Sequence, residues 1–368
     1  MKKIVFDYQL DGHNLEYLNH LYISAVKDCD NDYIFVLPLE FEKEKEVLSW
    51  PSSKNVLFSL FDVKNVFFNS PVRTAWASCK LLRKVVKQFK ASEVILIWMI
   101  AVLPFLPLFI PRGVKVSGII YRIYLYSWRR SSWLTKLQNA MKYWILAKSK
   151  CVDRVFILND NSSVCTLNKV WRTNKFTFLA DPYVPFSKDS VSDLRTELNV
   201  DKDKTIILHL GAMSLNKGTL SILDMIDNSK TEDLSNFVFV FAGRIYPNIK
   251  NEFYNRLTKL KNKADIIVKD SFLPYEYMGS LVFTCDKVLL PYKRTDMSSG
   301  SIAYAAQFEK QVFVPKSGLL GKLVRKYHIG TLVDNFNDVS ILNTPMNDRS
   351  TYCKSHTVQI FTKTILGI

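Results

Sequence analysis

The cysteines of this chain lack the spacing of a metal site or a disulfide framework. Six cysteines are scattered over 368 residues, and no two form a Cys-x-x-Cys pair (Cys29, Cys79, Cys151, Cys165, Cys285, Cys353). This argues against a zinc ribbon or a disulfide-rich fold and is typical of a reducing compartment. Gly-x-Gly-x-x-Gly and P-loop motifs are also missing. Their absence argues against dinucleotide-dependent dehydrogenases and P-loop kinases.

Long membrane-spanning runs are missing as well. The N-terminal residues, MKKIVFDYQL, contain too short an apolar stretch for a signal peptide. Residues 94–110 (VILIWMIAVLPFLPLFI) are apolar or proline throughout, but Pro104 and Pro107 would break a spanning helix. We therefore expect a buried strand at Val94–Met99, followed by a short apolar segment that packs in the core or dips into a bilayer surface.

Acidic residues are scarce in one long stretch. The chain has 50 Lys and Arg against 34 Asp and Glu, a formal net charge of +16. Between Lys64 and Lys150, sixteen basic residues accompany a single acid, Glu93, and tryptophans and tyrosines are interleaved with them (Trp76, Trp98, Trp128, Trp133, Trp144, Tyr121, Tyr124, Tyr126, Tyr143). A solvated basic face is the simplest interpretation. The mixture also suits an anionic membrane surface or single-stranded nucleic acid.

Strand-like apolar runs alternate with helix-like segments along most of the chain. In the first half we expect strands at Ile4–Tyr8, Tyr33–Leu37, Val56–Phe61, Val94–Met99, Val114–Tyr121 and Val155–Leu158, with helices at Leu15–Val26, Arg73–Phe89 and Trp133–Lys148. In the second half we expect strands at Thr205–Leu210, Phe237–Ala242, Ile266–Val268, Val288–Leu290 and Val312–Val314, each followed or preceded by a short helix. This alternation predicts an α/β fold with mostly parallel sheets.

A polar, proline-containing segment at residues 181–203 separates the two series. We therefore expect two Rossmann-like, doubly wound domains, at residues 1–185 and 186–350. The remaining tail, residues 351–368, has a candidate helix at Val358–Leu366 that would pack back on the first domain.

The stretch from 288 to 315 indicates a class of ligand. An apolar run that ends at Pro291 is followed by a polar loop and then by Ser298-Ser299-Gly300-Ser301, which opens an Ala-rich helix. Backbone N–H groups at a helix start and the helix dipole favour an anion such as a diphosphate. The serine hydroxyls would add hydrogen-bond donors.

Four local patterns occur in one order over residues 204–334. They are IILHLGAMSLNKGT, a strand that ends in Gly before a Lys-Gly loop; FVFVFAGRI, a strand that ends in Ala-Gly; the loop and helix VKDSFLPYEYMGSLV; and the helix start SSGSIAYA. In this order and spacing they resemble the GT4-like group (glycosyl transferases group 1) of GT-B glycosyltransferases. LADPYVP is similar to the segment that leads into the second domain of that group.

The resemblance implies a GT-B architecture, with two Rossmann-like domains facing a central cleft. It implies a metal-independent, retaining reaction without a cofactor. In this reaction a hexose moves from a nucleoside diphosphate sugar, the co-substrate, to a glycan hydroxyl. With the basic, aromatic stretch, it leads us to expect a lipid-linked acceptor of bacterial surface polysaccharide synthesis. The protein would then lie in the cytoplasm, peripherally bound to the inner face of the membrane, with no nucleic acid partner.

The resemblance also implies roles for individual residues. Catalytic roles fall to His13, Asp296 and Lys217, of which Lys217 would stabilise the departing diphosphate. The donor site would consist of Gly211, Lys217, Arg244, Phe272, Leu273, Ser298, Ser299, Gly300 and Ser301. The acceptor site would include Gly12, His13 and Glu16, while His209, in an apolar strand, is expected to be core.

Two positions depart from the pattern of the group. Many retaining members have Glu-x7-Glu around the helix start, where this chain has Asp296 and Tyr304. Ala212 or Met213 stands where many members have an arginine. A catalytically silent GT-B-like partner subunit and a basic nucleic-acid-binding protein therefore remain as alternatives. The Asp-x-Asp patterns at Asp28–Asp32 are common in acidic turns, and we expect no metal there.

Overall fold

The computed structural model describes residues 1–10, 13–43, 50–294, 296, 298–345 and 350–368. It divides into two compact units, which we call unit 1 (Met1–Asp181 and Val358–Ile368) and unit 2 (Pro182–Thr357). The boundary that we expected at 185–186 falls at Asp181–Pro182 instead, and the segment that returns to unit 1 begins at Val358 rather than at 351. Each unit is described by itself below.

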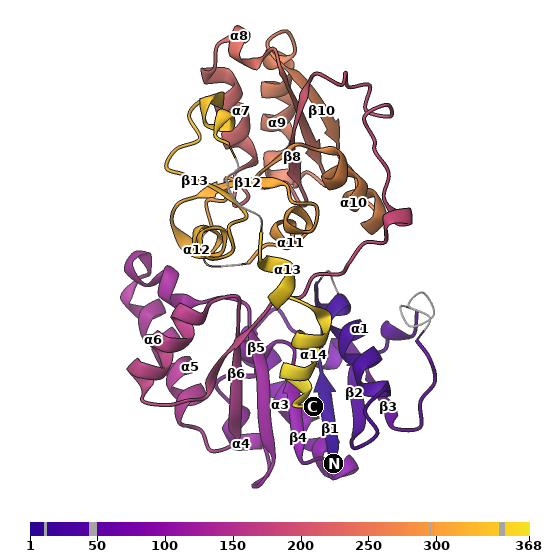
Figure 1. Ribbon diagram of the computed structural model, residues 1–368. Helices are drawn as coiled ribbons and strands as arrows, with labels where there is room; N and C mark the ends of the chain where they lie inside the picture. Colours follow the sequence, from indigo (N-terminus) through magenta and orange to yellow (C-terminus); the bar gives the residue numbers. More distant parts are fainter. Residues whose placement is uncertain (11–12, 44–49, 295, 297, 346–349) are drawn as a thin grey trace. The chain divides into compact units, whose positions relative to one another are not determined.

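Unit 1 contains a parallel sheet whose order, within the described residues, is β3-β2-β1-β4-β5-β6-β7 (Figure 1). Its strands are β1 (Lys2–Phe6), β2 (Asp32–Pro38), β3 (Val56–Phe61), β4 (Glu93–Leu96), β5 (Lys115–Ile120), β6 (Val152–Leu158) and β7 (Phe176–Leu179). Its α-helices are α1 (His13–Val26), α3 (Pro71–Phe89), α4 (Leu106–Phe109), α5 (Trp133–Lys148), α6 (Asn161–Trp171) and α14 (Val358–Leu366). Short 3₁₀ turns are η1 (Val63–Asn65), η2 (Met99–Val102), η3 (Tyr124–Tyr126) and η4 (Trp128–Arg130).

The apolar stretch at 94–110 forms three short elements. Strand β4 ends at Leu96, one turn of 3₁₀ helix follows at η2, and α4 completes the run. Most of its side chains are buried in unit 1, although Leu108 is 72% exposed. No helix of the described residues is long and apolar enough to cross a membrane.

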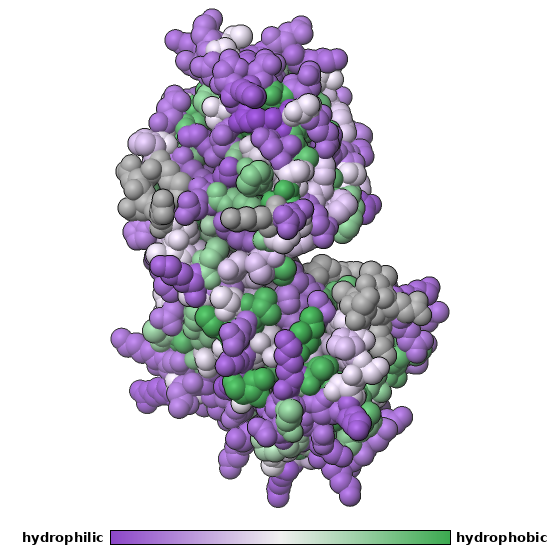
Figure 2. Space-filling view, turned by 45° about the vertical axis from the view of Figure 1, so that its right-hand side comes forward, coloured by the Kyte–Doolittle hydropathy of each residue, from purple (hydrophilic) through white to green (hydrophobic). Residues whose placement is uncertain are grey.

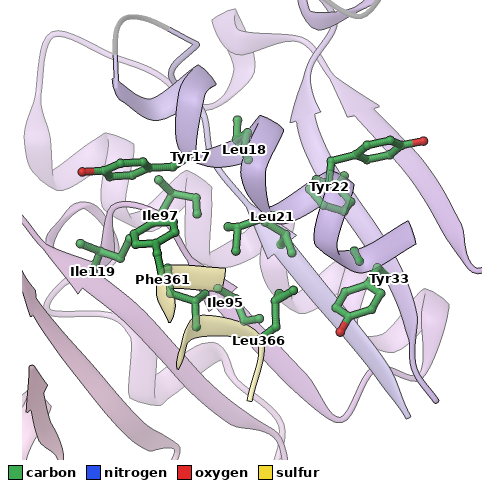
Figure 3. Close-up of a cluster of buried hydrophobic side chains, with 14 of the residues drawn as sticks. Tyr17, Leu18, Leu21, Tyr22, Tyr33, Ile95, Ile97, Ile119, Phe361 and Leu366 are labelled. Carbon is green, nitrogen blue, oxygen red and sulfur yellow. The ribbon is translucent and has the colours of Figure 1, made fainter. Parts of the chain in front are cut away.

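The core of unit 1 contains side chains from both the N-terminal and the C-terminal part of the chain. Figure 3 shows Tyr17, Leu18 and Leu21 of α1 beside Phe361 and Leu366 of α14, over apolar side chains of the central strands. Residues on both faces of β1, such as Ile4 and Val5, are fully buried. Helices therefore cover both faces of the sheet, as a parallel sheet requires.

Unit 2 contains a second parallel sheet, with the order β10-β9-β8-β11-β12-β13 in the part that is described. Its strands are β8 (Thr205–Leu210), β9 (Phe237–Ala242), β10 (Asp265–Lys269), β11 (Lys287–Leu289), β12 (Gln311–Pro315) and β13 (Gly330–Val333). Its helices are α7 (Thr219–Asn228), α8 (Thr231–Leu234), α9 (Pro247–Leu260), α10 (Tyr275–Thr284), α11 (Gly300–Gln307), α12 (Gly318–Tyr327) and α13 (Tyr352–Ser355), with 3₁₀ turns η5 (Lys188–Ser190) and η6 (Val339–Asn343).

The surface has few large apolar areas on the face that Figure 2 shows. Most of that face is hydrophilic, and apolar residues form small patches between hydrophilic ones.

Unit 2 has its own core, which includes Ile207, Phe239 and Phe241 of the central strands and Leu223 of α7. The predicted α/β fold with two doubly wound sheets is confirmed.

Candidate active site

The order of the strands in unit 2 reverses between β8 and β11. Strands β9 and β10 follow β8 on one side of it, whereas β11, β12 and β13 extend from the other side. In an open parallel sheet, the loops at such a point diverge and leave room for a ligand beyond the carboxyl ends of the strands. The loop at Gly211–Gly218 and the segment that begins at Pro291 leave the sheet there.

Two glycines fix the loop after β8. Gly218 has φ of +70°, and a Cβ added to it would lie 2.0 Å from the carbonyl oxygen of Pro291. Gly243, which follows β9, has φ of +135°, and its Cβ would lie 2.2 Å from the carbonyl oxygen of Gly211. Side chains would clash with the backbone at both points, so the loops can approach this closely only with glycine.

A chain of polar side chains crosses from this loop to α11. The Lys217 Nζ donates a hydrogen bond to the Tyr292 hydroxyl at 2.6 Å, and that hydroxyl lies 2.9 Å from the Ser299 Oγ. Lys217 is half-buried, whereas Ser299 is buried. The sequence predicted Lys217 and Ser299 as donor-site residues but missed Tyr292, which joins them. The sequence signal that could have identified Tyr292 is its position directly after Pro291, just beyond the end of β11.

The start of α11 lies against the end of β8. Ser299 is the N-cap residue of α11, and its side chain does not cap the helix. The Ser301 Oγ donates to the carbonyl oxygen of Leu210 at 3.5 Å. The N-terminal N–H groups of α11, the serine hydroxyls and the Lys217 ammonium thus gather at one edge of the sheet. Together they can bind an anion through charge, dipole and hydrogen bonds.

Asp296 forms a two-pronged pair with Arg294. The distances are 2.7 Å from Nε to Oδ1 and 3.1 Å from the second guanidinium nitrogen to Oδ2. The backbone N–H groups of Lys293 and Arg294 donate to the carbonyl oxygen of Asn216, which places the pair beside the Lys217 loop. A carboxylate has about four acceptor positions, so Asp296 can still accept hydroxyl hydrogen bonds while paired.

His209 is part of the scaffold of this edge. It is buried, its Nδ1 lies 2.9 Å from the carbonyl oxygen of Leu289, and its Nε2 lies 3.0 Å from the Thr219 Oγ1. Because a carbonyl only accepts, Nδ1 carries the proton and Nε2 accepts from Thr219. The Thr219 hydroxyl in turn accepts from the N–H of Ser214 at 3.1 Å. Burial lowers the pKa of His209 to about 4, so the ring is neutral and structural.

The loop after β9 meets the loop after β8 through its backbone. The N–H of Met213 donates to the carbonyl oxygen of Arg244 at 2.9 Å, and the Arg244 side chain is exposed. Asp270, at the end of β10, accepts the N–H of Ile245 at 2.8 Å and pairs with Lys250 at 2.7 Å. Sequence reasoning missed Asp270, whose role is to hold the Arg244 loop.

The two residues expected near a nucleotide base differ in exposure. Phe272 is 90% exposed, whereas Leu273 is buried. Phe272 is therefore open to a ring that stacks on it, while Leu273 can offer a ligand only its backbone.

Tyr304 of α11 lies in an aromatic cluster rather than alone. Phe186 stacks on Tyr275 with ring centroids 4.4 Å apart, and Tyr304 lies 5.6 Å from Phe186 and 5.7 Å from Tyr275. Gln307 fixes this arrangement, because it accepts the N–H of Phe186 and donates to the carbonyl of Val184. Tyr304, at the position where the resemblance to the retaining group would place a second acidic residue, thus belongs to an aromatic cluster.

The residues expected on the acceptor side belong to unit 1. His13 begins α1, and Gly12 lies outside the described residues. The Glu16 Oε1, in the first turn, lies 3.7 Å from the Nε2 of His20.

A buried polar cluster that the sequence did not reveal lies at the same end of unit 1. Asp7, after β1, accepts hydrogen bonds from the N–H of Tyr8 at 2.7 Å and from the Asn14 amide at 2.8 Å. Burial raises the pKa of Asp7 to about 7, against the lowering effect of these hydrogen bonds. Nearby, Tyr17 donates to Asp181, which follows β7. An aspartate side chain thus follows the carboxyl end of β1 and that of β7.

The acidic turn before β2 is a local structure. Asp28 accepts hydrogen bonds from the Asn31 amide, the Tyr33 hydroxyl and the N–H of Asp30. These hydrogen bonds lower the pKa of Asp28 although burial raises it. Among the described residues, no group of three or more His, Cys, Asp or Glu side chains is arranged to hold a metal ion.

Solved structures of similar fold cover the whole chain. HepE from Anabaena, in complex with UDP and glucose, matches with a TM-score of 0.70 and 17% identity over 100% of this chain and 98% of HepE. A glycosyltransferase from Rickettsia africae gives 0.70 and 13% over 100% and 97%. WaaG, a glycosyltransferase of lipopolysaccharide biosynthesis, gives 0.64 and 12% over 100% and 90%. The fold is GT-B.

The GT-B fold also serves proteins of other function. A putative UDP-N-acetylglucosamine 2-epimerase from Listeria monocytogenes matches with a TM-score of 0.61 and 9% identity over 99% of this chain and 94% of the epimerase. No protein-family model and no curated protein sequence matches the chain. The GT-B architecture is therefore established by structure, and the activity has to be argued from the side chains.

Proposed function

We propose that this protein is a glycosyltransferase that moves a hexose from a nucleoside diphosphate sugar to a glycan hydroxyl. The observation that carries the proposal is the chain Lys217–Tyr292–Ser299 at the point where the strand order of unit 2 reverses. HepE structures of the same fold contain UDP, UDP-glucose, or UDP and glucose, which supports a nucleotide-sugar donor.

Each residue has a role in this proposal. Lys217, the hydroxyls of Ser298 and Ser299 and the start of α11 bind the diphosphate. As the bond to the hexose breaks, negative charge grows on the leaving diphosphate, and the Lys217 ammonium stabilises it without a metal ion. Asp296, oriented by Arg294, accepts hydroxyls of the transferred hexose. His13 and Glu16 contact the acceptor, and the configuration at the anomeric carbon is retained.

The acceptor in this proposal is a glycan on a lipid carrier, as in bacterial surface polysaccharide synthesis. The sixteen bases and many aromatic residues between Lys64 and Lys150 support this, because both residue types favour the headgroup region of an anionic membrane. The protein would work peripherally at the inner face of the cell membrane.

Binding of the donor can be tested by thermal unfolding with UDP, GDP, ADP and TDP and with their sugars. A ligand at about 100 times its dissociation constant adds roughly 2.7 kcal/mol of stability, which gives a clear shift. We expect one base to stabilise the wild type, and Lys217→Met and Ser299→Ala to lose most of that stabilisation. Lys259→Met is the matched control, because Lys259 is an exposed lysine in the last turn of α9.

A turnover assay distinguishes the proposed transferase from a catalytically silent partner subunit. The silent subunit is the alternative that Tyr304 and its aromatic cluster favour. We expect release of the nucleoside diphosphate from its sugar in the presence of a lipid-linked glycan, with kcat/KM reduced by about 100-fold in Lys217→Met. Nucleotide binding without turnover on any acceptor would indicate the silent subunit. If the protein bound no nucleotide but bound a polyanion in a salt-sensitive way, the result would contradict the transferase proposal.

A further inference from the structure

Helix α5 carries a row of large apolar side chains that face solvent. Trp133, Leu137, Met141 and Trp144 are 70%, 59%, 44% and 53% exposed. At about 100° per residue, they fall within about a quarter of the helix circumference. The opposite face is buried through Tyr143, Leu146 and Ala147, and it packs toward β6. The exposed row is therefore additional to the buried face that attaches α5 to unit 1.

The surroundings of this row are basic. On a helical projection, Lys136 and Lys142 lie on opposite sides of the row, about 100° and 140° from its centre. Arg129 and Arg130 precede the helix, and the Lys136 Nζ lies 5.8 Å from the ring of Trp128. Long basic side chains beside an apolar row can extend their charges toward headgroups while the row enters the acyl region.

Acidic groups are nearly absent from the elements around α5. Between Glu93 and Asp181 the only acids are Asp153 and Asp160, against thirteen lysines and arginines. Asp160 caps α6 and accepts hydrogen bonds from Ser163 and Tyr126, and Asp153 lies 3.6 Å from Arg154. Helix α6, which packs beside α5, has no acidic residue at all. The charge around the row is thus predominantly positive and complements an anionic surface.

We propose that α5 attaches this protein to an anionic lipid surface, with the row Trp133–Leu137–Met141–Trp144 inserted among the lipids. This proposal assigns a specific element, α5, to the membrane contact of the proposed function. It rests on that proposed function for the identity of the acceptor. A protein partner would fit an apolar row equally well, but the excess of bases on both sides of it favours lipid phosphate. Tryptophans near both ends of the row also match the preference of indole rings for the headgroup region.

The test is co-sedimentation with vesicles of phosphatidylcholine, with or without about one third phosphatidylglycerol. We expect the wild type to bind only the anionic vesicles and to dissociate as salt rises. Leu137→Asp, at the centre of the row, should reduce the partition coefficient at least about ten-fold, because it removes apolar contact and adds repulsion. Lys136→Glu with Lys142→Glu should reduce it similarly and flatten the salt dependence.

Leu57→Asp is the matched control, because Leu57 is 54% exposed on strand β3, away from the apolar stretch at 94–110. It should bind vesicles like the wild type. Equal binding by Leu137→Asp and the wild type, or no binding of the wild type to anionic vesicles, would overturn the proposal. A dimer that Leu137→Asp dissociates, seen by sedimentation without lipid, would instead assign the row to a second copy of the chain. Nucleotide-induced stabilisation, measured on the same variants, reports separately on folding and on the proposed function.

Discussion

The first strand of each unit leads into a different kind of loop. In unit 1, β1 is followed by Asp7, a buried carboxyl whose pKa is raised by burial to about 7. In unit 2, β8 is followed by Gly211 and then by the loop that carries Lys217. Both loops leave the carboxyl edge of a parallel sheet, where ligands of this architecture bind. The shared architecture therefore determines the edge at which a ligand can bind. In unit 2, the described side chains there offer a cation, Lys217, and the start of α11 to a phosphate.

Glycine substitutions should give the largest difference in stability loss between the two units. Gly218→Ala should destabilise unit 2 by about 2–4 kcal/mol, because the methyl group would clash with the Pro291 carbonyl in a left-handed backbone conformation. Gly113→Ala in unit 1 is the control, since Gly113 has φ of +85° but no atom within 4 Å of the added carbon. It should cost about 1 kcal/mol. Urea unfolding of both variants measures the difference, and equal losses would show that the close contact does not matter.

The pH dependence of unit 1 should reveal Asp7. The raised pKa means that the folded state favours the protonated carboxyl, so its contribution to stability is full below pH 3.8 and is lost as pH rises through 7. We expect the wild type to lose about 2–3 kcal/mol from this group between pH 5 and pH 8. Asp7→Asn should remove that loss and leave the chain more stable than the wild type at pH 8. Parallel stability curves for the two proteins would contradict the assignment.

The pH dependence of unit 2 should have the opposite sign. Burial lowers the pKa of His209 and of His356 to about 4. Their contribution to the free energy of unfolding is therefore full above pH 6.5 and is lost as pH falls toward 4. For His209 alone we expect a loss of about 2 kcal/mol between pH 7 and pH 4.5. His209→Gln keeps one donor and one acceptor, and calorimetry should show a shallower acid slope with His356 still contributing. An unchanged slope would place the acid sensitivity elsewhere.

Local sequence signals were sufficient for the architecture. The all-apolar run at β9, Phe237–Ala242, together with Gly243 and Pro247 after it, indicates a strand buried on both faces. The Lys-Gly loop and the Ser-Ser-Gly helix start are equally local, which is why Lys217 and Ser299 could be named from sequence. The roles proposed for Lys217 and Ser299, like those for His13, Glu16 and Asp296, remain predictions.

The tertiary structure decided which of these groups meet. Tyr292 lies between Lys217 and Ser299 only because β8 and β11 are neighbours in the sheet, although 75 residues separate Lys217 from Tyr292. Asp7 became a titratable group near neutrality because α1 and its neighbours bury it, and its sequence context carries no sign of that. Apolar period and turn residues act over a few positions, so the sequence alone determined the elements. Burial, strand order and close backbone contacts involve distant segments, so only the folded chain determined the site.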